Sequence, residues 1–170
     1  MSSDQIQNAH NRDVVLSEEE REAFLAGVHV GVISMTRAKL APLTLPVCYG
    51  YEPGDDVRIV IEQDSFKTQL LERTGRFSIC VQDEAPPFKY VSAEGPITSI
   101  TTADIARDLG PIVQAYLGDR RRKKYVDLLL SSHGETYKPL VLIRMRPEHW
   151  WSANLGLQDF WKQIMAEPAD

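Results

Sequence analysis

Residues 43–61 read LTLPVCYGYEPGDDVRIVI and contain two β-type runs joined by a short turn. Residues 57–61 are rich in β-branched side chains, which favour strands. Residues 52–56 carry proline, glycine and two aspartates, which are residue types that form tight turns. We therefore expect residues 57–61 to fold back on residues 43–51 as an antiparallel hairpin.

Four further runs have the composition of strands, and they cover residues 28–36, 76–82, 88–101 and 140–145. The run 76–82 alternates apolar with polar or small side chains, the pattern of a half-buried strand. Gly95 and Pro96 predict a bulge or bend within the long run. Most runs follow one another through short connections, whereas a parallel sheet needs a crossover between every pair of strands. The sequence therefore predicts a mainly β fold, a six-stranded antiparallel barrel, closed or nearly closed, with peripheral helices.

Helices are predicted at five places along the chain. Ser17 and Glu20 have the spacing of a capping box, which predicts a helix over residues 18–26. A second helix covers residues 65–74, with Ser65 or Asp64 as its cap and Gly75 as its stop. Apolar residues at helical spacing predict two more helices between residues 102 and 131. Residues 157–165 are expected to form one or two final helical turns.

Composition indicates a single globular domain. The chain has 170 residues, 43% of them hydrophobic and 25% charged, and we expect one domain over residues 14–170 behind a disordered polar tail at residues 1–13. The net charge of −5 argues against nucleic-acid binding. No apolar run is long enough to cross a membrane. The chain begins without an apolar signal segment, which predicts a cytoplasmic location.

Motifs with a strong enzymatic signature are absent from the sequence. It contains neither a P-loop nor a dinucleotide-binding fingerprint. Cys48 and Cys80 lie in apolar runs and are expected to be buried free thiols. The four histidines have no ligand spacing, so no metal site is predicted.

The most informative local pattern is the junction between a strand and a helix at residues 59–67, IVIEQDSFK. Ser65 and Lys67 stand in the first turn of the predicted helix, where free backbone amides and the helix dipole favour an anion. A phosphate site is one interpretation of this junction. The other is that Ser65 only caps the helix and that Lys67 is solvated.

Several short motifs follow one another in a fixed order along the chain. They are residues 32–37 (VISMTR), 46–51 (PVCYGY), 65–67 (SFK), 87–91 (PFKYV) with 94–96 (EGP), and 146–151 (RPEHWW). In this order they resemble the FMN-binding split-barrel family that includes pyridoxamine 5′-phosphate oxidase and its flavin- or deazaflavin-dependent relatives. The resemblance extends from Leu16 to Trp151 and depends on the order of the motifs.

The resemblance implies a cofactor, a set of contacts and a homodimer. The cofactor is FMN, or alternatively a deazaflavin, and it lies at the interface of two subunits. The residues that the resemblance assigns to the cofactor are Lys67 and Ser65 at its phosphate, Pro46, Val47, Cys48, Ile61 and Glu62 along its ring system, and Gln82 facing it.

The chain also departs from the family's pattern. Residues 38–42 replace an Asp-Gly-x-Pro turn, and Leu45 and Pro46 stand where pyridoxamine phosphate oxidases carry an arginine. One phosphate-binding cation is therefore lost, for which Arg37 is a candidate replacement. Vitamin B6 oxidation is accordingly not expected.

The resemblance implies an oxidoreductase that transfers a hydride to or from a small molecule. Because a flavin carries this chemistry itself, no residue of the chain is assigned as catalytic. The alternative is a non-catalytic flavin- or haem-binding protein on the same barrel. The basic run at residues 120–124 is either a solvated helix face or a contact for a deazaflavin's anionic tail. Trp150 and Trp151 are either packing residues or walls of a pocket for a planar substrate.

Overall fold

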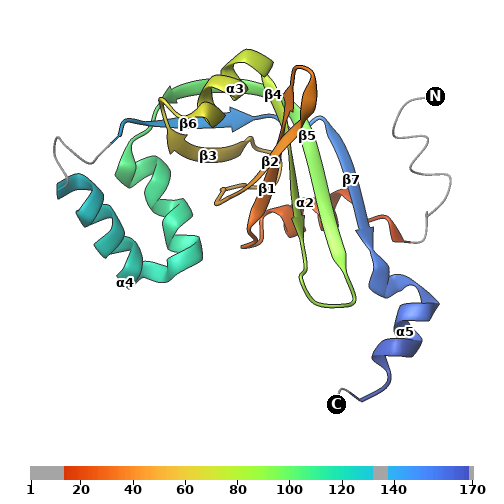
Figure 1. The fold of residues 1–170 in the computed structure, drawn as a ribbon. Coiled ribbons are helices and arrows are strands. Elements are labelled where there is room, and N and C mark those ends of the chain that lie inside the picture. Colours follow the sequence, from red (N-terminus) through yellow and green to blue (C-terminus); the bar gives the residue numbers. More distant parts are fainter. Residues whose placement is uncertain (1–13, 132–137, 169–170) are drawn as a thin grey trace.

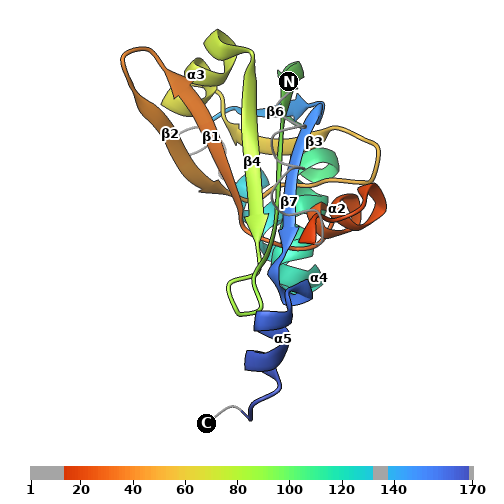
Figure 2. The same ribbon diagram turned by 90° about the vertical axis from the view of Figure 1, so that its right-hand side faces the viewer.

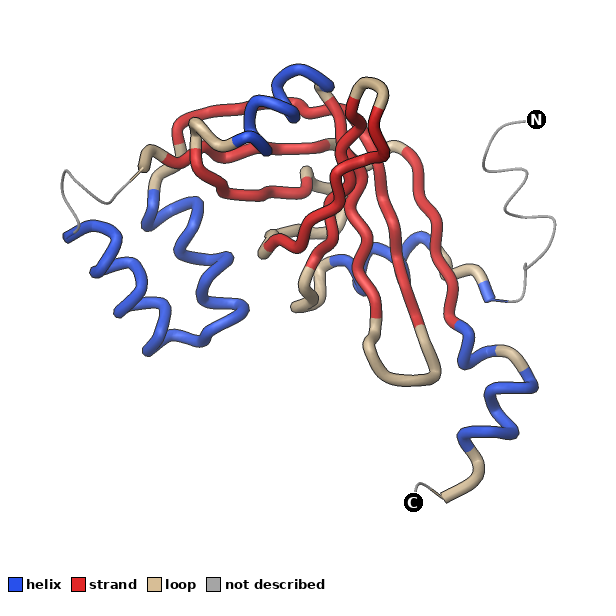
Figure 3. The backbone as a smooth tube through the Cα atoms, viewed as in Figure 1, coloured by secondary structure: helices blue, strands red, loops and turns tan. Residues whose placement is uncertain are grey.

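The computed structural model of the chain describes residues 14–131 and 138–168, and the predicted tail at residues 1–13 lies outside them. The strands are β1 (Gly31–Arg37), β2 (Leu40–Val47), β3 (Val57–Glu62), β4 (Arg76–Gln82), β5 (Lys89–Thr102), β6 (Leu140–Met145) and β7 (His149–Asn154). The helical segments are α2 (Glu18–Leu25), α3 (Phe66–Thr74), η2 (Ile105–Leu109), α4 (Gly110–Ser131), η3 (Leu155–Leu157) and α5 (Asp159–Met165). The strands form one curved, open sheet with the helices around its outside (Figure 1 and Figure 3).

All strand pairs in the sheet are antiparallel, in the order β2-β1-β4-β5-β6-β3. The long strand β5 joins two halves, because its first part pairs with β7 and its second part with β6. The register shifts between Ile97 and Ser99, close to the predicted bend at Gly95 and Pro96. A Cβ atom at Gly95 would lie 1.7 Å from the carbonyl oxygen of Arg146, so only glycine fits where these two backbones cross. The predicted antiparallel split barrel is confirmed, but the sheet does not close, because its edge strands β2 and β3 do not pair with each other.

The predicted hairpin between residues 43–51 and 57–61 is wrong. β2 pairs with β1, whereas β3 pairs along its whole length with β6. The backbone of the segment after β2 pairs with β3 at the isolated bridge between Gly50 and Arg58. The predicted turn does form, since Asp55 N donates to Glu52 O at 2.9 Å. β6 is the partner of β3 because the buried Ile59 and Ile143 lie opposite each other in the core, a long-range match that local turn chemistry does not reveal.

The described part of the sheet has seven strands, one more than predicted. The additional strand is β7, because the chain turns after β6 and residues His149–Asn154 pair with the other half of β5. Trp150 of β7 packs against the core, with its ring 6.3 Å from that of Tyr51 and the Arg21 guanidinium 5.0 Å from its centroid. Trp150 is therefore a packing residue.

The predicted helices are present. Both hydrogen bonds of the capping box join Ser17 and Glu20 at the start of α2. Ser65 caps α3, and Gly75 ends it in a left-handed conformation with φ 66°. Two helices are predicted between residues 102 and 131. The first consists of η2 and the first part of α4, and the second is the remaining part of α4. They meet at a kink at Gly118, where φ is 75° (Figure 1).

The core lies between the two halves of the sheet. Alternate residues of the strands point into it, and the largest side chains that are fully buried are Leu25, Ile33, Met35, Ile59, Leu70, Leu71, Ile79, Ile143 and Met145. The same alternation places the remaining residues of β3 and β6 on the outer face of the sheet, on the side where α4 lies. No helix in the described ranges is both long and apolar enough to span a membrane.

Candidate functional site

The junction between β3 and α3 has the local geometry of an anion site. Ser65 Oγ accepts a hydrogen bond from Thr68 N at 3.2 Å, and Thr68 Oγ1 donates to Glu62 O at 2.6 Å. Ser65 O accepts a hydrogen bond from Gln69 N. The backbone amides of Phe66 and Lys67, in the same turn, have no hydrogen-bond partner among the described residues. The first turn of α3 is thus fixed by Ser65, and two of its amides remain available.

Lys67 stands beside these amides and is half-buried. Its ammonium group takes part in none of the ion pairs formed within residues 14–131 and 138–168. Its side chain lines a cavity of about 340 Å³ that lies between the end of β2, the end of β3 and the helix α4. A free ammonium at a helix N-terminus provides the charge that a phosphate group requires.

The cavity is mainly apolar. Its lining consists of Pro46, Val47, Cys48, Val60, Ile61, Lys67, Leu109, Ile112, Val113, Tyr116, Leu117 and Tyr125. Lys67 is the one charged residue in this lining. A cavity of this size and composition, with one charged group in its lining, suits part of a planar organic ligand with an anionic tail.

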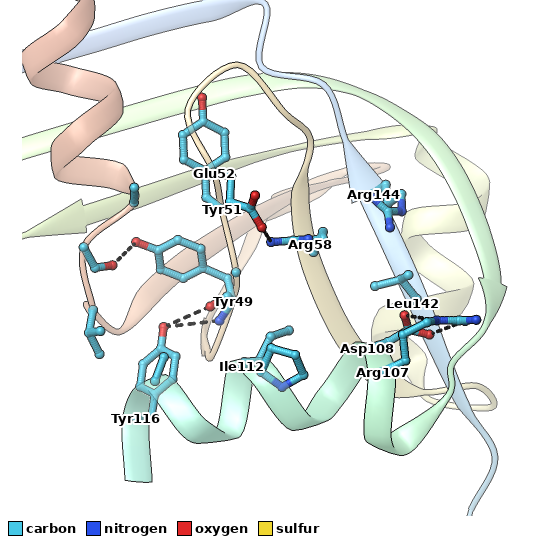
Figure 4. A pocket seen from close by; sticks show the side chains of 16 residues that line it. Tyr49, Tyr51, Glu52, Arg58, Arg107, Asp108, Ile112, Tyr116, Leu142 and Arg144 are labelled. Carbon is cyan, nitrogen blue, oxygen red and sulfur yellow. Dashed lines mark hydrogen bonds and ion pairs between the residues drawn. The ribbon is translucent and has the colours of Figure 1, made fainter. Parts of the chain in front are cut away.

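The helix α4 forms one wall of the cavity and is held in place through Tyr116. Tyr116 Oη donates to His29 O at 2.5 Å and accepts from Tyr49 N at 3.2 Å. Tyr49 Oη in turn donates to Leu25 O at 2.6 Å. Figure 4 shows the hydrogen bonds between Tyr116 and Tyr49. These bonds connect α4 to the residues that precede β1 and to those that follow β2. They fix the distance between the helical wall and the strand ends.

Cys48 and Tyr116 of the lining are both protonated at neutral pH. Partial loss of contact with water raises the pKa of the Cys48 thiol above its usual range. Burial also raises the pKa of the Tyr116 phenol. The lining offers one positive charge, one thiol and the hydroxyls of two tyrosines, and it contains no carboxylate or imidazole.

Five of the eight residues assigned to the cofactor from sequence line this cavity, namely Pro46, Val47, Cys48, Ile61 and Lys67. Ser65 does not line it, but its hydroxyl positions the first turn of α3 beside Lys67. The Glu62 carboxylate is bonded to Lys138 Nζ at 3.2 Å, and Gln82 is an exposed residue at the end of β4. The roles of all eight residues in cofactor binding stay predictions.

The sequence interpretation missed the helical wall. The apolar spacing of residues 109–117 predicts a helix, but nothing in the local pattern shows that this helix faces the ends of β2 and β3. Arg37, the candidate replacement for the lost cation, donates from Nε to Ala41 O at 2.8 Å and so belongs to the hairpin of β1 and β2. The expectation of two buried thiols is wrong, because Cys48 is exposed and Cys80 is half-buried on the outer face of β4.

Comparison with known proteins shows which fold this chain has. No protein-family profile and no curated protein matches the sequence. The conserved hypothetical protein Rv2991 of Mycobacterium tuberculosis has a similar structure, with 20% sequence identity, a TM-score of 0.67 and coverage of 93% of this chain and 92% of that one. An F420 reductase is 16% identical, with a TM-score of 0.59 and coverage of 76% and 94%. A candidate pyridoxamine 5′-phosphate oxidase of Listeria innocua is 15% identical, with a TM-score of 0.56 and coverage of 81% and 98%. At these identities the shared property is the fold, which is the split barrel that the sequence resemblance predicts.

Proposed function

We propose that this protein binds a flavin-type cofactor, FMN or a deazaflavin, in the cavity between β2, β3 and α4, and that it acts as an oxidoreductase on a small molecule. Lys67 carries the proposal. It is the one charged residue that lines an otherwise apolar cavity, it has no ion-pair partner among the described residues, and it stands beside the free amides of α3. The likeness to an F420 reductase and to a candidate pyridoxamine 5′-phosphate oxidase supports the same class of ligand.

The residues present fit such a group. Lys67, with the amides of Phe66 and Lys67, would hold the phosphate, while Ser65 keeps the first turn of α3 in position. Val47, Ile61 and the helical wall would lie along the ring system and exclude water from it. A bound flavin or deazaflavin supplies the hydride chemistry itself, so the chain has only to bind and orient the cofactor and to exclude water from it.

We also propose that two copies of the chain form a homodimer through the outer face of the larger half of the sheet. Residues in register across five strands form an uncharged row on this face, from Pro46 through Val32, Cys80 and Ser92 to Trp151. Figure 2 looks onto β1, β4 and β7, and none of the described helices lies across them. Gln82 follows Cys80 by two residues in β4 and therefore points to the same face. A cofactor shared between the subunits could contact it there.

Visible absorption of the purified protein, followed by titration with FMN and with the deazaflavin F420, tests the proposed cofactor. Saturable binding of either is expected. Exchanging Lys67 for alanine should weaken the affinity for this cofactor about ten- to a hundredfold, the range expected for a lost charge-assisted hydrogen bond. Arg73→Ala, at the other end of α3 and exposed, is the matched control and should bind as the wild type does. If K67A binds as tightly as the wild type, the phosphate assignment is wrong.

Non-catalytic cofactor binding is the second candidate, because the cavity lining has no carboxylate or imidazole that could move a proton. Steady-state turnover separates the two functions. The loaded protein would be supplied with a reduced nicotinamide or a reduced deazaflavin and an electron acceptor. Turnover that K67A loses supports the oxidoreductase, whereas tight binding without turnover for a broad set of acceptors supports the binding protein.

A further inference from the structure

Arg58 and Arg144 lie directly opposite each other on neighbouring strands. They are partners in the antiparallel register of β3 and β6, and both are on the outer face of the sheet, because the residues on either side of them point into the core. Side chains at such positions are within about 5 Å of each other at Cβ. Two like charges placed in this way repel each other and destabilise the sheet.

The acidic residues nearby neutralise this pair only in part. Arg58 Nη2 lies 2.7 Å from Glu52 Oε1, on a carboxylate side chain that is 71% exposed. The Asp108 carboxylate accepts two hydrogen bonds from Arg107, each of 2.9 Å. The guanidinium of Arg144 forms no hydrogen bond or ion pair with the residues that the structure describes. Three guanidinium groups and two carboxylates therefore line one pocket. Arg144 is the one whose guanidinium has no hydrogen-bonded partner among the described residues, and it attracts Asp56 and Asp108 only over a longer distance.

These groups line a pocket of about 200 Å³ on the outer face of the sheet (Figure 4). Tyr51 and Gly50 border it on one side, and Leu142 lies at its base. It lies next to the cavity that Lys67 lines, since Ile112 and Tyr116 of α4 belong to the walls of both, but Lys67 is not part of its lining. Its size suits a group of a few heavy atoms and is below that of a site for a whole cofactor.

We propose that Arg58 and Arg144 bind the oxyanion group of a small molecule, a carboxylate or a phosphate, in this pocket. A planar guanidinium donates two parallel hydrogen bonds to either group, and two facing guanidinium groups can hold one anion between them. A bound anion also removes the repulsion between the two arginines, so binding and the stability of β3 against β6 are coupled. This site does not depend on the proposed cofactor.

Calorimetric titration of the full chain with inorganic phosphate and with acetate, at constant ionic strength, tests the site. Saturable binding of at least one of them is expected, and the one bound more tightly identifies the group that the site takes. Thermal unfolding in the same solutions should show a rise in Tm that follows the binding curve. The absence of saturable binding for both anions would overturn the proposal.

Two substitutions change the affinity in opposite directions. Arg144→Gln removes the unpaired guanidinium and should weaken binding about ten- to a hundredfold. Glu52→Gln frees Arg58 from its carboxylate partner and should tighten binding severalfold.

Two controls assign the anion to this pocket. Lys67→Ala leaves both arginines in place and should bind phosphate here as the wild type does, which separates this site from the cofactor cavity. Arg73→Gln removes an exposed arginine elsewhere and should change nothing. Equal affinity in R144Q and the wild type, or an unchanged affinity in E52Q, would contradict the assignment of the anion to the Arg58–Arg144 pair.

Discussion

Arg146 Nε lies 2.5 Å from Asp56 Oδ1, and this ion pair joins the connection between β6 and β7 to the start of β3. The Asp56 side chain is 8% exposed, and its second oxygen accepts a hydrogen bond from Thr98 Oγ1 at 2.6 Å. The carboxylate of Asp56 therefore joins its own segment to two others that are distant in sequence, those of Thr98 and Arg146. They meet where β5 passes from one half of the sheet to the other.

Replacing Asp56 with alanine should lower the free energy of unfolding by about 1–3 kcal/mol, because the Thr98 hydroxyl and the Arg146 guanidinium lose a charged partner. Urea unfolding followed by tryptophan fluorescence measures this change. Glu84→Ala removes an exposed carboxylate from the loop after β4 and is the matched control, with an expected change within about 0.5 kcal/mol. Equal stability of D56A and the wild type would show that the ion pair contributes nothing.

The Asp56 contribution should also depend on pH in the acid range. Burial alone would raise the pKa of Asp56, but the hydrogen bonds from Thr98 and Arg146 outweigh it and hold the pKa below the ordinary value of 3.8. A carboxyl group whose pKa is lower in the folded than in the unfolded state contributes its full stability above the unfolded pKa and loses it as the pH falls through the folded pKa. The difference in stability between the wild type and D56N should therefore be larger at pH 7 than at pH 3.

Urea midpoints at the two pH values check this expectation. Asp108 also has a lowered pKa, owing mainly to its hydrogen bonds with Arg107, but it is present in both proteins and cancels in the difference. A difference between the wild type and D56N that is the same at pH 3 and pH 7 would rule out the proposed linkage.

Exchanging Tyr116 for phenylalanine should loosen the helical wall of the cavity. The change leaves His29 O without its donor and Tyr49 N without its acceptor, and we expect a loss of about 1–3 kcal/mol in stability. Weaker cofactor binding should accompany it, because the distance between α4 and the strand ends is no longer fixed. Tyr125→Phe is the matched control, since Tyr125 lines the same cavity, is 42% exposed and has no hydrogen bond from its hydroxyl to a described residue. If Y116F and Y125F behave alike, the hydrogen bonds of Tyr116 do not hold the wall.

A glutamate in place of Val32 should separate the proposed homodimer. Val32 stands in the middle of the uncharged row on the outer face, and a charge buried against a second copy would have no partner there. Light scattering coupled to size-exclusion chromatography measures the mass of the particle, which should fall from two chains to one. Gln69→Glu places the same charge on the exposed face of α3 and should leave the mass unchanged. A wild-type protein with the mass of one chain would exclude the dimer at once.

The sequence predicted those features that depend on neighbouring residues. The capping box at Ser17 and Glu20 and the cap and stop of α3 at Ser65 and Gly75 form as expected, because a cap is a contact between residues three to five positions apart. The alternation in β4 shows which of its residues enter the core, because side chains on a strand point alternately to its two faces. Together with the order of the motifs, these patterns were enough to predict the split barrel and to place Lys67 beside a helix N-terminus.

Features that depend on contacts between distant residues came from the tertiary structure alone. β3 pairs with β6 across about 80 residues of sequence, β7 adds to β5, and α4 closes a cavity over the ends of β2 and β3. Hydrophobic pairing has no preferred partner along the chain, so each of these contacts is decided by which surfaces meet once the whole sheet has formed. The juxtaposition of Arg58 and Arg144 arises in the same way. Each of them is an ordinary charged residue on the outer face of its own strand, and only the pairing of β3 with β6 turns them into neighbours.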